Sequence, residues 1–527
     1  MLDAIRIINL RSFIDSGFIE LKPITILVGK NSCGKSTFLR TFPLLRQSVE
    51  SKTKGPILWY GSYVDFGAFS EAKSTLTDDD TISFEFSLSI PLHVLNQNSS
   101  FRNSLRRLKA NNDVPVNVSI SVSNKKGATI FDSVKIEMEE RKIQIKYSGV
   151  DRCSMTIKSD DFEHIDETLF FSSSNLIPPL LQKTKEQYII VGENNQPETR
   201  NITRVVRYEP DSRLKNDAYE KLKGYFYRTT RSDTIISGIQ KMLIANDASV
   251  LDNLIRTIYR ENQYFINKYK SDQDKINKLF MDYTFAFNVN NIIDVINRVL
   301  ISSFKSTKYI APLRSTAERY YRYQDLQVDE IDHTGSNLAM LLSSLTDTER
   351  DAFSAWTMRY FDFSVKAEES GLHYAIKIKS KGSNREYNIN DMGFGYSQIL
   401  PIIASIWLEI NNKKRTPFIR NEVTFTIEQP ELHLHPELQN KLAKLFVTTV
   451  KLATENGINL RFIFETHSKN MIDAIGEAIE DEKISHEQVN VYIFDKASIE
   501  DKTDVKKSSF DSDGYLVDWP IGFFSGN

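Results

Sequence analysis

The spacing of hydrophobic residues changes along the chain and predicts different structures in turn. Residues 1–28 alternate between apolar and polar positions and end in the apolar run Ile24–Val28, which predicts strands. Residues 81–158 repeat this alternation in several segments separated by polar turns, which predicts an antiparallel sheet. Between about 212 and 305, apolar residues recur at helical steps with almost no Gly or Pro, so this part is predicted to be helical.

From about residue 308 onwards, short apolar runs alternate with amphipathic segments. The predicted strands and helices, in chain order, are 372–379 (strand), 398–411 (helix), 423–428 (strand), 436–454 (helix) and 460–464 (strand). Strands that alternate with helices favour a parallel sheet, because each connection between parallel strands has to cross over. The pattern therefore predicts an α/β fold.

The overall charge and composition restrict the class of protein. The 527 residues carry 67 Lys and Arg against 69 Asp and Glu, so any attraction for nucleic acid must be local. Two cysteines, Cys33 and Cys153, exclude a disulfide framework and fit a reducing compartment. The sequence has no apolar run long enough for a membrane span, and its N-terminal residues lack the apolar core of a signal peptide. We therefore expect a soluble, cytoplasmic protein with no membrane partner.

The segment Ile24–Thr37, ITILVGKNSCGKST, has the spacing G-x-x-x-x-G-K-[ST] between a predicted strand and a predicted helix. This is the context of a phosphate-binding P-loop, in which Lys35 reaches the β- and γ-phosphates and the Ser36 hydroxyl binds Mg²⁺. The candidate nucleotide-binding residues are Gly29, Lys30, Asn31, Ser32, Cys33, Gly34, Lys35, Ser36 and Thr37. The chain is predicted to bind ATP or GTP.

Two other predicted strands end in residues that suit nucleotide chemistry. The strand in TFTIEQPELHLHP ends in Glu428, and a carboxylate in this position beside a P-loop holds Mg²⁺. Ser36 and Glu428 are therefore the predicted metal ligands. The strand in RFIFETHS is followed by His467, which can bond a γ-phosphate or orient the attacking water.

A fourth motif, NDMGFGYSQILP, places Gly393, Gly395 and Ser397 at the start of an apolar helix, which is again an anion site. The motifs follow one another in the order P-loop, long insertion, glycine-serine signature, strand-end acid with a trailing proline, and T-H-S. This order resembles that of the ABC-type ATPases, in the branch with SMC-like, RecF-like and OLD-like proteins. The segments ELHLHPELQ, IAPLRSTAERYY, GFGYSQILP and DWPIGFFSGN look like a bacterial subgroup of OLD-type ATPases. That subgroup includes the PtuA-like ATPases of Septu and retron antiphage systems.

The resemblance implies a composite nucleotide site. Such ATPases bind two ATP molecules between two heads, and each site uses the P-loop of one head and the glycine-serine signature of the other. The resemblance also implies that Glu428 coordinates Mg²⁺, that His467 is the switch histidine and that His433–His435 crosses the dimer interface. The implied cofactors are ATP and Mg²⁺, and the implied assembly is a homodimer or higher oligomer through the heads.

Gln429 stands where most ABC-type ATPases have a glutamate that acts as general base. An amide does not accept a proton at neutral pH, and losing a general base typically costs about 10²–10⁴-fold in rate. Gln still orients water in some GTPases, and Glu431 is an alternative base. The candidate catalytic residues are therefore Glu428, Gln429, Glu431 and His467, and hydrolysis is expected to be slow.

The stretch 200–231 carries nine Lys or Arg against four acids, with four tyrosines among them. Basic residues mixed with aromatic ones bind nucleic acid in many proteins. Charge runs more often form a solvated helix face, which is the favoured interpretation here. Nucleic-acid binding therefore stays open.

Two acidic patterns invite a metal interpretation. Glu431, His433 and His435 have a ligand-like spacing but lack further obvious ligands nearby. Asp511 and Asp513 have the spacing of a metal pair. However, only 60 residues follow His467, which are too few for a Toprim nuclease domain of about 100 residues like that of OLD-like relatives. The segment SFDSDGYL is therefore predicted to be a turn, and any nuclease is expected in a partner chain.

The predicted organisation is an ABC-type ATPase head in two parts, 1–80 and 308–527, with a β-rich side sheet at 81–160 and a mostly helical insertion at 161–307. The expected function is an ATP-dependent regulatory or sensor subunit of a bacterial antiphage defence complex. Its expected partner is a separate nuclease of the HNH type, with a retron reverse transcriptase and its msDNA as further candidates. The alternative is a DNA-binding repair or recombination ATPase of the RecF or SMC type.

Overall fold

The computed structural model describes residues 1–53, 55–96, 113–149, 151–172, 176–191, 197–244, 248–322, 328–370, 373–411, 421–498 and 500–519. The chain forms two compact units. Unit 1 comprises Met1–Ile5, Ser51–Leu58 and Asp79–Ile301, and unit 2 comprises Arg6–Glu50, Trp59–Asp78 and Ser302–Asn527. Of the segment DWPIGFFSGN, which is residues 518–527, residues 520–527 lie outside the described residues.

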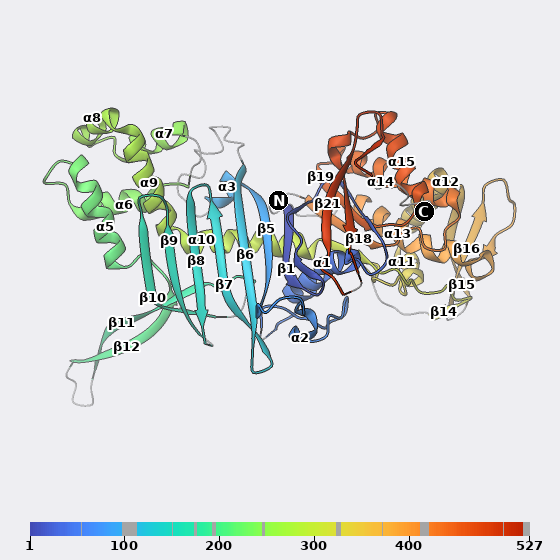
Figure 1. Cartoon of the computed structure of the whole chain (residues 1–527), viewed down its shortest axis with the longest axis horizontal. Helices are drawn as coiled ribbons and strands as arrows, with labels where there is room; N and C mark the ends of the chain where they lie inside the picture. The colour runs from blue at the N-terminus through green and yellow to red at the C-terminus, as the bar shows by residue number, and fades with distance from the viewer. Residues whose placement is uncertain are drawn as a thin grey trace. The chain divides into compact units, whose positions relative to one another are not determined.

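Unit 1 contains a long antiparallel sheet (Figure 1). Its strands include β5 (Thr81–Pro91), β6 (Asp113–Lys125), β7 (Ala128–Met138), β8 (Arg141–Ser148), β9 (Arg152–Lys158), β10 (Glu163–Phe171), β11 (Leu180–Val191) and β12 (Pro197–Arg207), and each of these pairs with the next. Alternate residues of β6 are buried, as expected for a sheet with one covered face. The sheet extends past the predicted limit at 160, because β10, β11 and β12 continue it before the first long helix begins.

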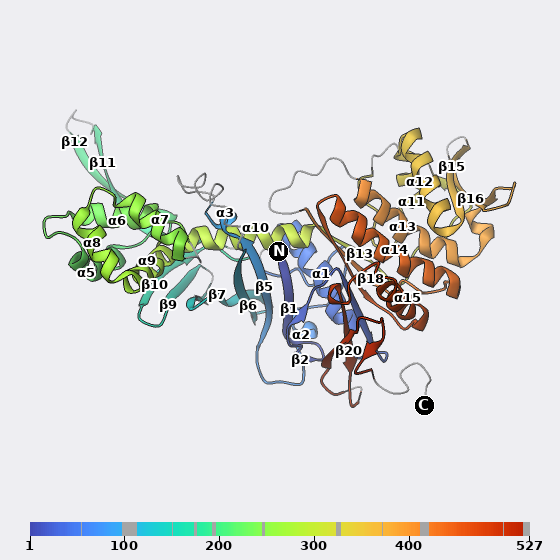
Figure 2. The same cartoon turned by 90° about the horizontal axis from the view of Figure 1, so that it is seen from above.

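Most helices of unit 1 follow the sheet in sequence; α5 to α9 gather in one cluster, and α10 runs out of it (Figure 2). They are α5 (Ser212–Leu222), η1 (Lys223–Tyr225), α6 (Ser232–Lys241), α7 (Ala248–Ile258), α8 (Gln263–Ser271), α9 (Gln273–Phe287) and α10 (Val289–Lys305), preceded by the short α3 (Leu92–Leu95). Side chains cap two of these helices: Asp211 accepts the Leu214 N–H at 2.8 Å and Asn262 accepts the Phe265 N–H at 3.0 Å.

Unit 2 contains a seven-stranded sheet in the order β13-β18-β19-β4-β20-β21-β22. These strands are β13 (Thr307–Ile310), β18 (Asn421–Glu428), β19 (Ile458–Glu465), β4 (Ile24–Gly29), β20 (Val489–Asp495), β21 (Asp504–Phe510) and β22 (Leu516–Val517). The first five are parallel to one another. Every residue of β4 is buried, as is typical of a parallel strand with both faces covered.

Helices and a smaller sheet complete unit 2. The helices are α1 (Lys35–Glu50), α2 (Phe69–Ala72), α11 (Leu338–Ser344), α12 (Asp347–Phe361), η2 (Ile389–Met392), α13 (Phe394–Asn411), α14 (Pro436–Glu455), α15 (Lys469–Glu480) and η3 (His486–Gln488). The smaller sheet has the strands β14 (Tyr321–Arg322), β15 (Phe363–Ser370), β16 (His373–Ser380) and β17 (Tyr387–Asn388). The N-terminal strands are β1 (Leu2–Leu10), β2 (Phe13–Asp15) and β3 (Ile19–Glu20). The predicted α/β fold class, with a β-rich side sheet and a mostly helical insertion, is confirmed.

The register of the parallel sheet brings three strand ends together. Glu428 at the end of β18 pairs with Glu465 at the end of β19, and Glu465 pairs with Leu27 of β4. Because the carboxyl ends of parallel strands lie at one edge of the sheet, both glutamates lie beside the loop that follows β4. Ligands of open α/β sheets bind at this edge.

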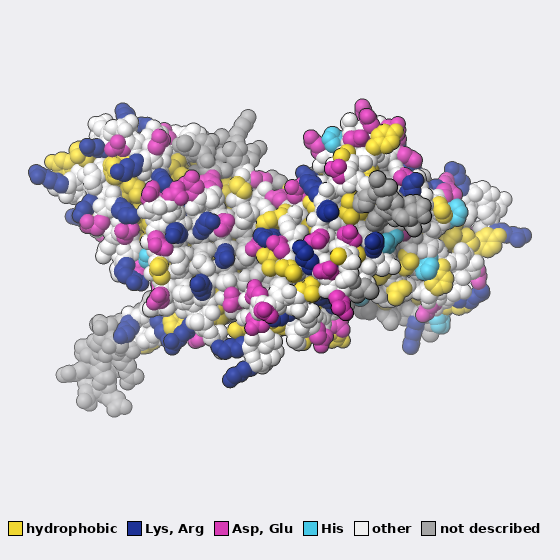
Figure 3. Space-filling model, in the orientation of Figure 1, with side chains coloured by type: hydrophobic (Ala, Val, Ile, Leu, Met, Phe, Trp, Pro, Cys, Tyr) yellow, Lys and Arg dark blue, Asp and Glu magenta, His cyan; other side chains and the backbone are white. Residues whose placement is uncertain are grey.

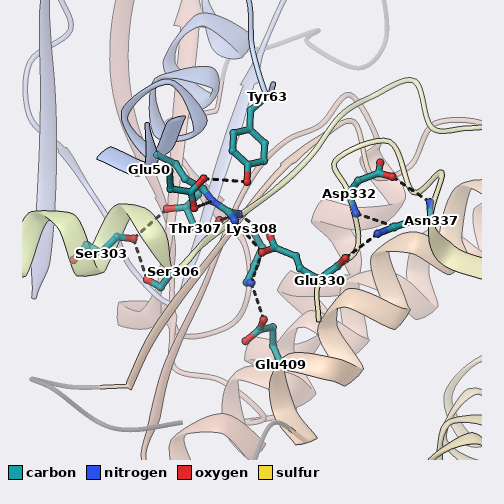
Figure 4. A network of polar contacts seen from close by, with 11 residues as sticks. Glu50, Tyr63, Ser303, Ser306, Thr307, Lys308, Glu330, Asp332, Asn337 and Glu409 are labelled. Carbon is teal, nitrogen blue, oxygen red and sulfur yellow. Dashed lines mark hydrogen bonds and ion pairs between the residues drawn. The ribbon is translucent and has the colours of Figure 1, made fainter. Parts of the chain in front are cut away.

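A polar network holds the C-terminal end of α1 (Figure 4). Arg46, which is buried, donates to the Thr307 carbonyl at 2.6 Å and to Glu330 Oε1 at 2.7 Å. Lys308 of β13 lies 3.0 Å from both Glu330 and Glu409 of α13. These ion pairs tie the P-loop helix to β13 and α13 at the end opposite the loop. Among the described residues, no helix is both long and apolar enough to cross a membrane.

Candidate functional site

The loop between β4 and α1 has a backbone that only glycine fits at two positions. Gly29 has φ 151°, and a Cβ there would lie 2.2 Å from the Phe494 carbonyl oxygen. Gly34 has φ 93°, and a Cβ there would lie 2.8 Å from Thr503 Oγ1. Both close approaches keep the loop against the sheet edge and expose its N–H groups at the start of α1, the arrangement that binds phosphate.

Lys35 begins α1 and its side chain is folded into the loop. Its ammonium donates to the Gly29 carbonyl at 2.9 Å and to the Lys30 carbonyl at 2.7 Å. Burial lowers the pKa of Lys35, against the opposing charge of Glu465. The ammonium is therefore held at the loop by carbonyl oxygens, which are weaker partners for it than phosphate oxygens.

A cavity of about 290 Å³ opens in front of the loop. Its lining residues are Arg11, Ser12, Ser32, Cys33, Gly34, Lys35, Ser36, Thr37 and Lys496. Three of them are cations and none is an acid, so the cavity suits an anionic ligand. The structure brings most of the predicted loop residues to this cavity, whereas Lys30 and Asn31 are exposed and do not line it. The sequence alone did not single out Arg11 and Lys496.

The two strand-end glutamates have different partners. Ser36 Oγ donates to Glu465 Oε2 at 2.7 Å. Glu428, with 1% of its surface exposed, accepts from Arg40 at 2.6 and 2.7 Å and from the Tyr309 hydroxyl at 2.6 Å. The predicted metal ligands Ser36 and Glu428 therefore do not contact each other here. The carboxylate on Ser36 is that of Glu465, which the sequence patterns did not assign.

Burial and the neighbouring charge of Glu428 shift the titration of Glu465. The pKa of Glu465 is raised to about 7, first by burial and then by the charge of Glu428. The hydrogen bonds from Arg40 to Glu428 raise the pKa of Arg40, so that arginine stays charged. Two cations, Lys35 and Arg40, thus oppose the charge of the two adjacent carboxylates. Two carboxylates and a serine hydroxyl are oxygen donors of the kind that Mg²⁺ prefers, so these residues fit the ion that the motifs imply.

The turn after β18 is held by a buried arginine. Gln429 has φ 42°, in the left-handed region, and its N–H donates to the Glu465 carbonyl at 3.2 Å. Arg314 Nη2 donates to the Glu428 carbonyl at 3.0 Å and to the Gln429 carbonyl at 3.4 Å. Burial lowers the pKa of Arg314 to about 10. Arg314 belongs to the quoted segment IAPLRSTAERYY, and its contacts show that this segment supports the turn.

Glu431 and His467 lie together beside this turn. The His467 N–H donates to Glu431 Oε1 at 2.7 Å, and Glu431 Oε2 is buried without a hydrogen-bond partner among the described residues. Burial raises the pKa of Glu431. Partial burial, followed by the charge of Lys35, lowers the pKa of His467, which favours a neutral imidazole. The arrangement leaves one carboxylate oxygen and one imidazole for a ligand or a water molecule.

The glycine-serine turn lies elsewhere on unit 2. Its α13 begins at Phe394, so Ser397 is inside the first turn, where it is buried and donates to the Phe394 carbonyl at 2.7 Å. Gly393 is exposed with φ 83°, and Phe394 is 57% exposed with its ring centroid 5.6 Å from that of His433. These residues do not line the cavity of their own chain. The exposed part of the motif is Gly393 and Phe394, Gly395 is partly exposed, and the Ser397 hydroxyl is already hydrogen-bonded.

The two acidic patterns have local roles in the structure. His435 caps α14 by accepting the Glu437 N–H at 3.3 Å, and His433 has φ 61° at the preceding turn. Asp511 accepts the N–H groups of Asp513 and Tyr515, which forms the predicted turn between β21 and β22. Within the described part of the chain, no three His, Cys, Asp or Glu side chains gather as a metal site.

The chain belongs to the AAA ATPase domain family, whose model matches residues 1–472. Endonuclease GajA from Bacillus cereus (strain HuB5-5) is 22% identical to it over 316 residues. The match covers 56% of this chain and 44% of the relative, so the chain spans less than half the length of that protein. The family match and the parallel sheet around β4 agree with the predicted ABC-type ATPase head.

Two solved structures are weakly similar to the chain. One is the SMC head domain from Thermotoga maritima, with a TM-score of 0.34 and 8% identity, covering 96% of this chain and 98% of that one. The other is the SmcHead bound to the C-winged helix domain of ScpA, with a TM-score of 0.33, 10% identity and the same coverage. Similarity at this level does not extend to a function.

Proposed function

We propose that this chain is the cytoplasmic, ATP-binding regulatory or sensor subunit of a bacterial antiphage defence complex, and that it controls a nuclease in a partner chain. The observation that carries the ATP-binding part is the P-loop geometry. Lys35 is buried against the Gly29 carbonyl, and Ser36 next to it is bonded to Glu465. Phosphate oxygens in the cavity would replace the loop carbonyls as partners of the Lys35 ammonium.

The metal part of the proposal uses both strand-end acids. Ser36 and Glu465 are in contact, so an ion bound to the nucleotide would meet the Ser36 hydroxyl and the Glu465 carboxylate together. Glu428, the acid assigned from the motif, becomes available to Mg²⁺ when Arg40 and Tyr309 release it. Bound Mg²⁺ would supply positive charge that neutralises the paired carboxylates and the phosphates. Until then, the ion pair with Arg40 compensates the negative charge of Glu428.

Slow turnover is the second part of the proposal. The backbone N–H of Gln429 donates to the Glu465 carbonyl, which holds the residue at the end of β18. Because its side-chain amide does not accept a proton, Gln429 orients water at most. Glu431 retains a buried oxygen without a partner and lies beside His467, which makes it the alternative base. A subunit that hydrolyses slowly stays in its ATP-bound state long enough to act as a switch.

The regulatory part rests on assembly. Gly393 and Phe394 are exposed and Gly395 is partly exposed, and all three lie outside the cavity of their own chain, which suits a signature that completes the nucleotide site of a second copy. We propose a homodimer or higher oligomer through the heads, with two shared ATP molecules. The partner nuclease, of the HNH type, and a retron reverse transcriptase with msDNA are inferred from the sequence resemblance. A relative named as an endonuclease is in keeping with a link to nuclease function.

The test is calorimetric ATP binding with Mg²⁺. Lys35→Ala removes the β- and γ-phosphate contact and should weaken ATP binding at least tenfold, about 1.4 kcal/mol. Lys451→Ala is the matched control, because Lys451 is an exposed lysine of α14, outside the P-loop. Equal ATP affinity of wild type and Lys35→Ala would overturn the nucleotide-site assignment.

The alternative of a DNA-binding repair ATPase makes a different prediction. Hydrolysis by such a protein should rise on addition of double-stranded DNA. Hydrolysis that does not respond to DNA, combined with ATP-dependent activity of a co-expressed nuclease, would favour the defence subunit.

A further inference from the structure

A second cavity lies within unit 1, between the helices that follow the long sheet. It has a volume of about 380 Å³, within the range of about 300–1,000 Å³ typical of ligand pockets. It is lined by α5, η1, α6 with the segment before it, and α8. The lining residues are Tyr219, Lys223, Gly224, Phe226, Tyr227, Arg228, Thr230, Ile235 and Tyr264. None of these residues belongs to the P-loop site.

Two tyrosines at this cavity are exposed. Tyr227 is 51% exposed and Tyr264 is 43% exposed, although large aromatic side chains are usually buried for most of their area. Their ring centroids lie 5.8 Å apart with an interplanar angle of 72°, so each ring contacts the edge or face of the other. A pair of accessible aromatic rings offers a stacking surface for a planar ligand.

Cations accompany the tyrosines. Lys223 and Arg228 line the cavity, and Arg231 follows within the same segment. Lys223 forms an ion pair with Glu220, whereas within the described residues Arg228 and Arg231 have no carboxylate partner. Figure 3 shows Lys or Arg side chains beside hydrophobic ones at the end of the helical cluster where α5 and α8 lie. Because the whole chain has a net charge of −2, this positive charge is a local feature.

The floor of the cavity is closely packed. Phe226 stacks on Phe265 with ring centroids 4.3 Å apart and an interplanar angle of 9°, and it also contacts Tyr259 at 5.1 Å. The Tyr259 hydroxyl donates to the Ile235 carbonyl at 2.9 Å. A Cβ added at Gly224, which also lines the cavity, would have no atom within 4 Å, so there is open space beside this residue. The packed floor holds the exposed rings and cations in a fixed arrangement and leaves space for a ligand.

From this combination we propose that the cavity binds single-stranded nucleic acid, with a base stacked on Tyr227, its edge toward Tyr264, and a neighbouring phosphate at Lys223 and Arg228. Aromatic stacking with a positively charged groove is how proteins bind unpaired strands without base-specific contacts. A duplex hides its base faces and would not reach the tyrosines. The site is independent of the P-loop, so it does not rest on the ATP-binding proposal.

The proposal is tested on the full-length chain by fluorescence anisotropy. The probes are labelled single strands of about 16 nucleotides, one of DNA and one of RNA, chosen to cover the site size of one binding surface. Tyr227→Ala should weaken binding about 5- to 150-fold, the range expected for loss of one stacked base. Tyr227→Phe keeps the ring and should bind like wild type. Arg228→Gln should weaken binding and reduce the slope of log affinity against log salt by about one.

Matched controls separate this site from general effects. Tyr515→Ala removes a 71% exposed tyrosine in unit 2, and Arg213→Gln removes an exposed arginine of α5 that is already paired with Asp211. Both should bind like wild type. Lys35→Ala should also retain strand binding, which distinguishes failure at this cavity from failure of the nucleotide site.

Three results would overturn the proposal. One is absence of binding by wild type to both labelled strands at low salt. Another is equal loss of binding in Tyr227→Ala and Tyr515→Ala, with circular dichroism showing both variants folded. A third is competition: if AMP or a duplex of the same length displaces the strand as well as unlabelled strand does, the cavity is a nucleotide pocket or a merely electrostatic surface. A difference between the DNA and RNA probes would identify which strand it prefers.

Discussion

Glu465 provides a sharp test of the site's electrostatics, because a carboxyl group with 2% exposure lies beside the charged Glu428. Its pKa of about 7, against an ordinary 4.5, corresponds to about 3 kcal/mol of lost stability when the carboxyl is ionised in the fold. Glu465→Gln removes this charge and keeps an oxygen that accepts from Ser36. The variant should therefore be more stable than wild type at alkaline pH.

The direction with pH follows from the raised pKa. Below about pH 4.5 the carboxyl is protonated in both folded and unfolded chains, so Glu465 costs nothing. Between about pH 4.5 and 7 the unfolded chain loses the proton more readily, and wild-type stability falls as the pH rises. Above pH 7 the full cost remains. The stability difference between Glu465→Gln and wild type should grow from about 1 kcal/mol at pH 5 to about 3 kcal/mol at pH 8.

Urea unfolding followed by tryptophan fluorescence measures this difference. All four tryptophans, Trp59, Trp356, Trp407 and Trp519, belong to unit 2, so the signal reports the unit that contains Glu465. The experiment uses a chelator and no nucleotide, and Glu487→Gln, at an exposed position, is the control. A difference that stays constant between pH 5 and 8, or a variant less stable than wild type at pH 8, would refute the reasoning. Either result would mean that the neighbouring cations compensate the ionised Glu465.

Three further variants test other parts of the site. Arg40→Gln leaves Glu428 buried without its main partner and should lower the free energy of unfolding by about 2–3 kcal/mol, less than for a fully buried pair because Arg40 is 34% exposed. Gln429→Glu should raise the rate of ATP hydrolysis, measured by phosphate release, because it restores a group able to accept a proton. Gly395→Arg should leave ATP binding to a single head unchanged, because residue 395 does not line the cavity and a Cβ there lies 3.5 Å from the His433 carbonyl oxygen, an ordinary contact distance. The variant should still block the ATP-dependent association measured by light scattering.

Each of these has a contradicting outcome. The Arg40→Gln loss should be partly recovered in the double variant with Glu428→Gln, and no recovery would mean that the arginine acts through packing. A wild-type hydrolysis rate in the usual enzyme range of about 1–10³ per second, with no gain in Gln429→Glu, would sink the slow-turnover idea. Association of Gly395→Arg at the wild-type level would remove residues 393–395 from the interface. Ser397→Arg is a poorer probe of that interface, because Ser397 is buried and the added bulk would disturb α13.

The nature of the fold and the position of the phosphate loop followed from local sequence. The P-loop spacing lies between an apolar run and a helix, so neighbouring residues alone encode both the loop and its flanking elements. The same holds for the strands that end in Glu428 and Glu465 and for the turn at Asp511, because period and turn chemistry are short-range signals. The strands β10–β12 were missed, since their apolar and polar positions alternate weakly.

The partners of the site residues were decided only by the tertiary structure. Ser36 meets Glu465 across 429 positions of sequence, and Arg40 meets Glu428 across 388. These contacts form because β19 pairs with β4 in the sheet and β18 pairs with β19. A motif states which residue types are present, but the strand order and register decide which carboxylate reaches the serine. The burial of Ser397 likewise depends on where α13 begins, and the exposure of Tyr227 and Tyr264 depends on how α5 and α8 pack. Such contacts form between segments that are distant in sequence, and no local pattern specifies them.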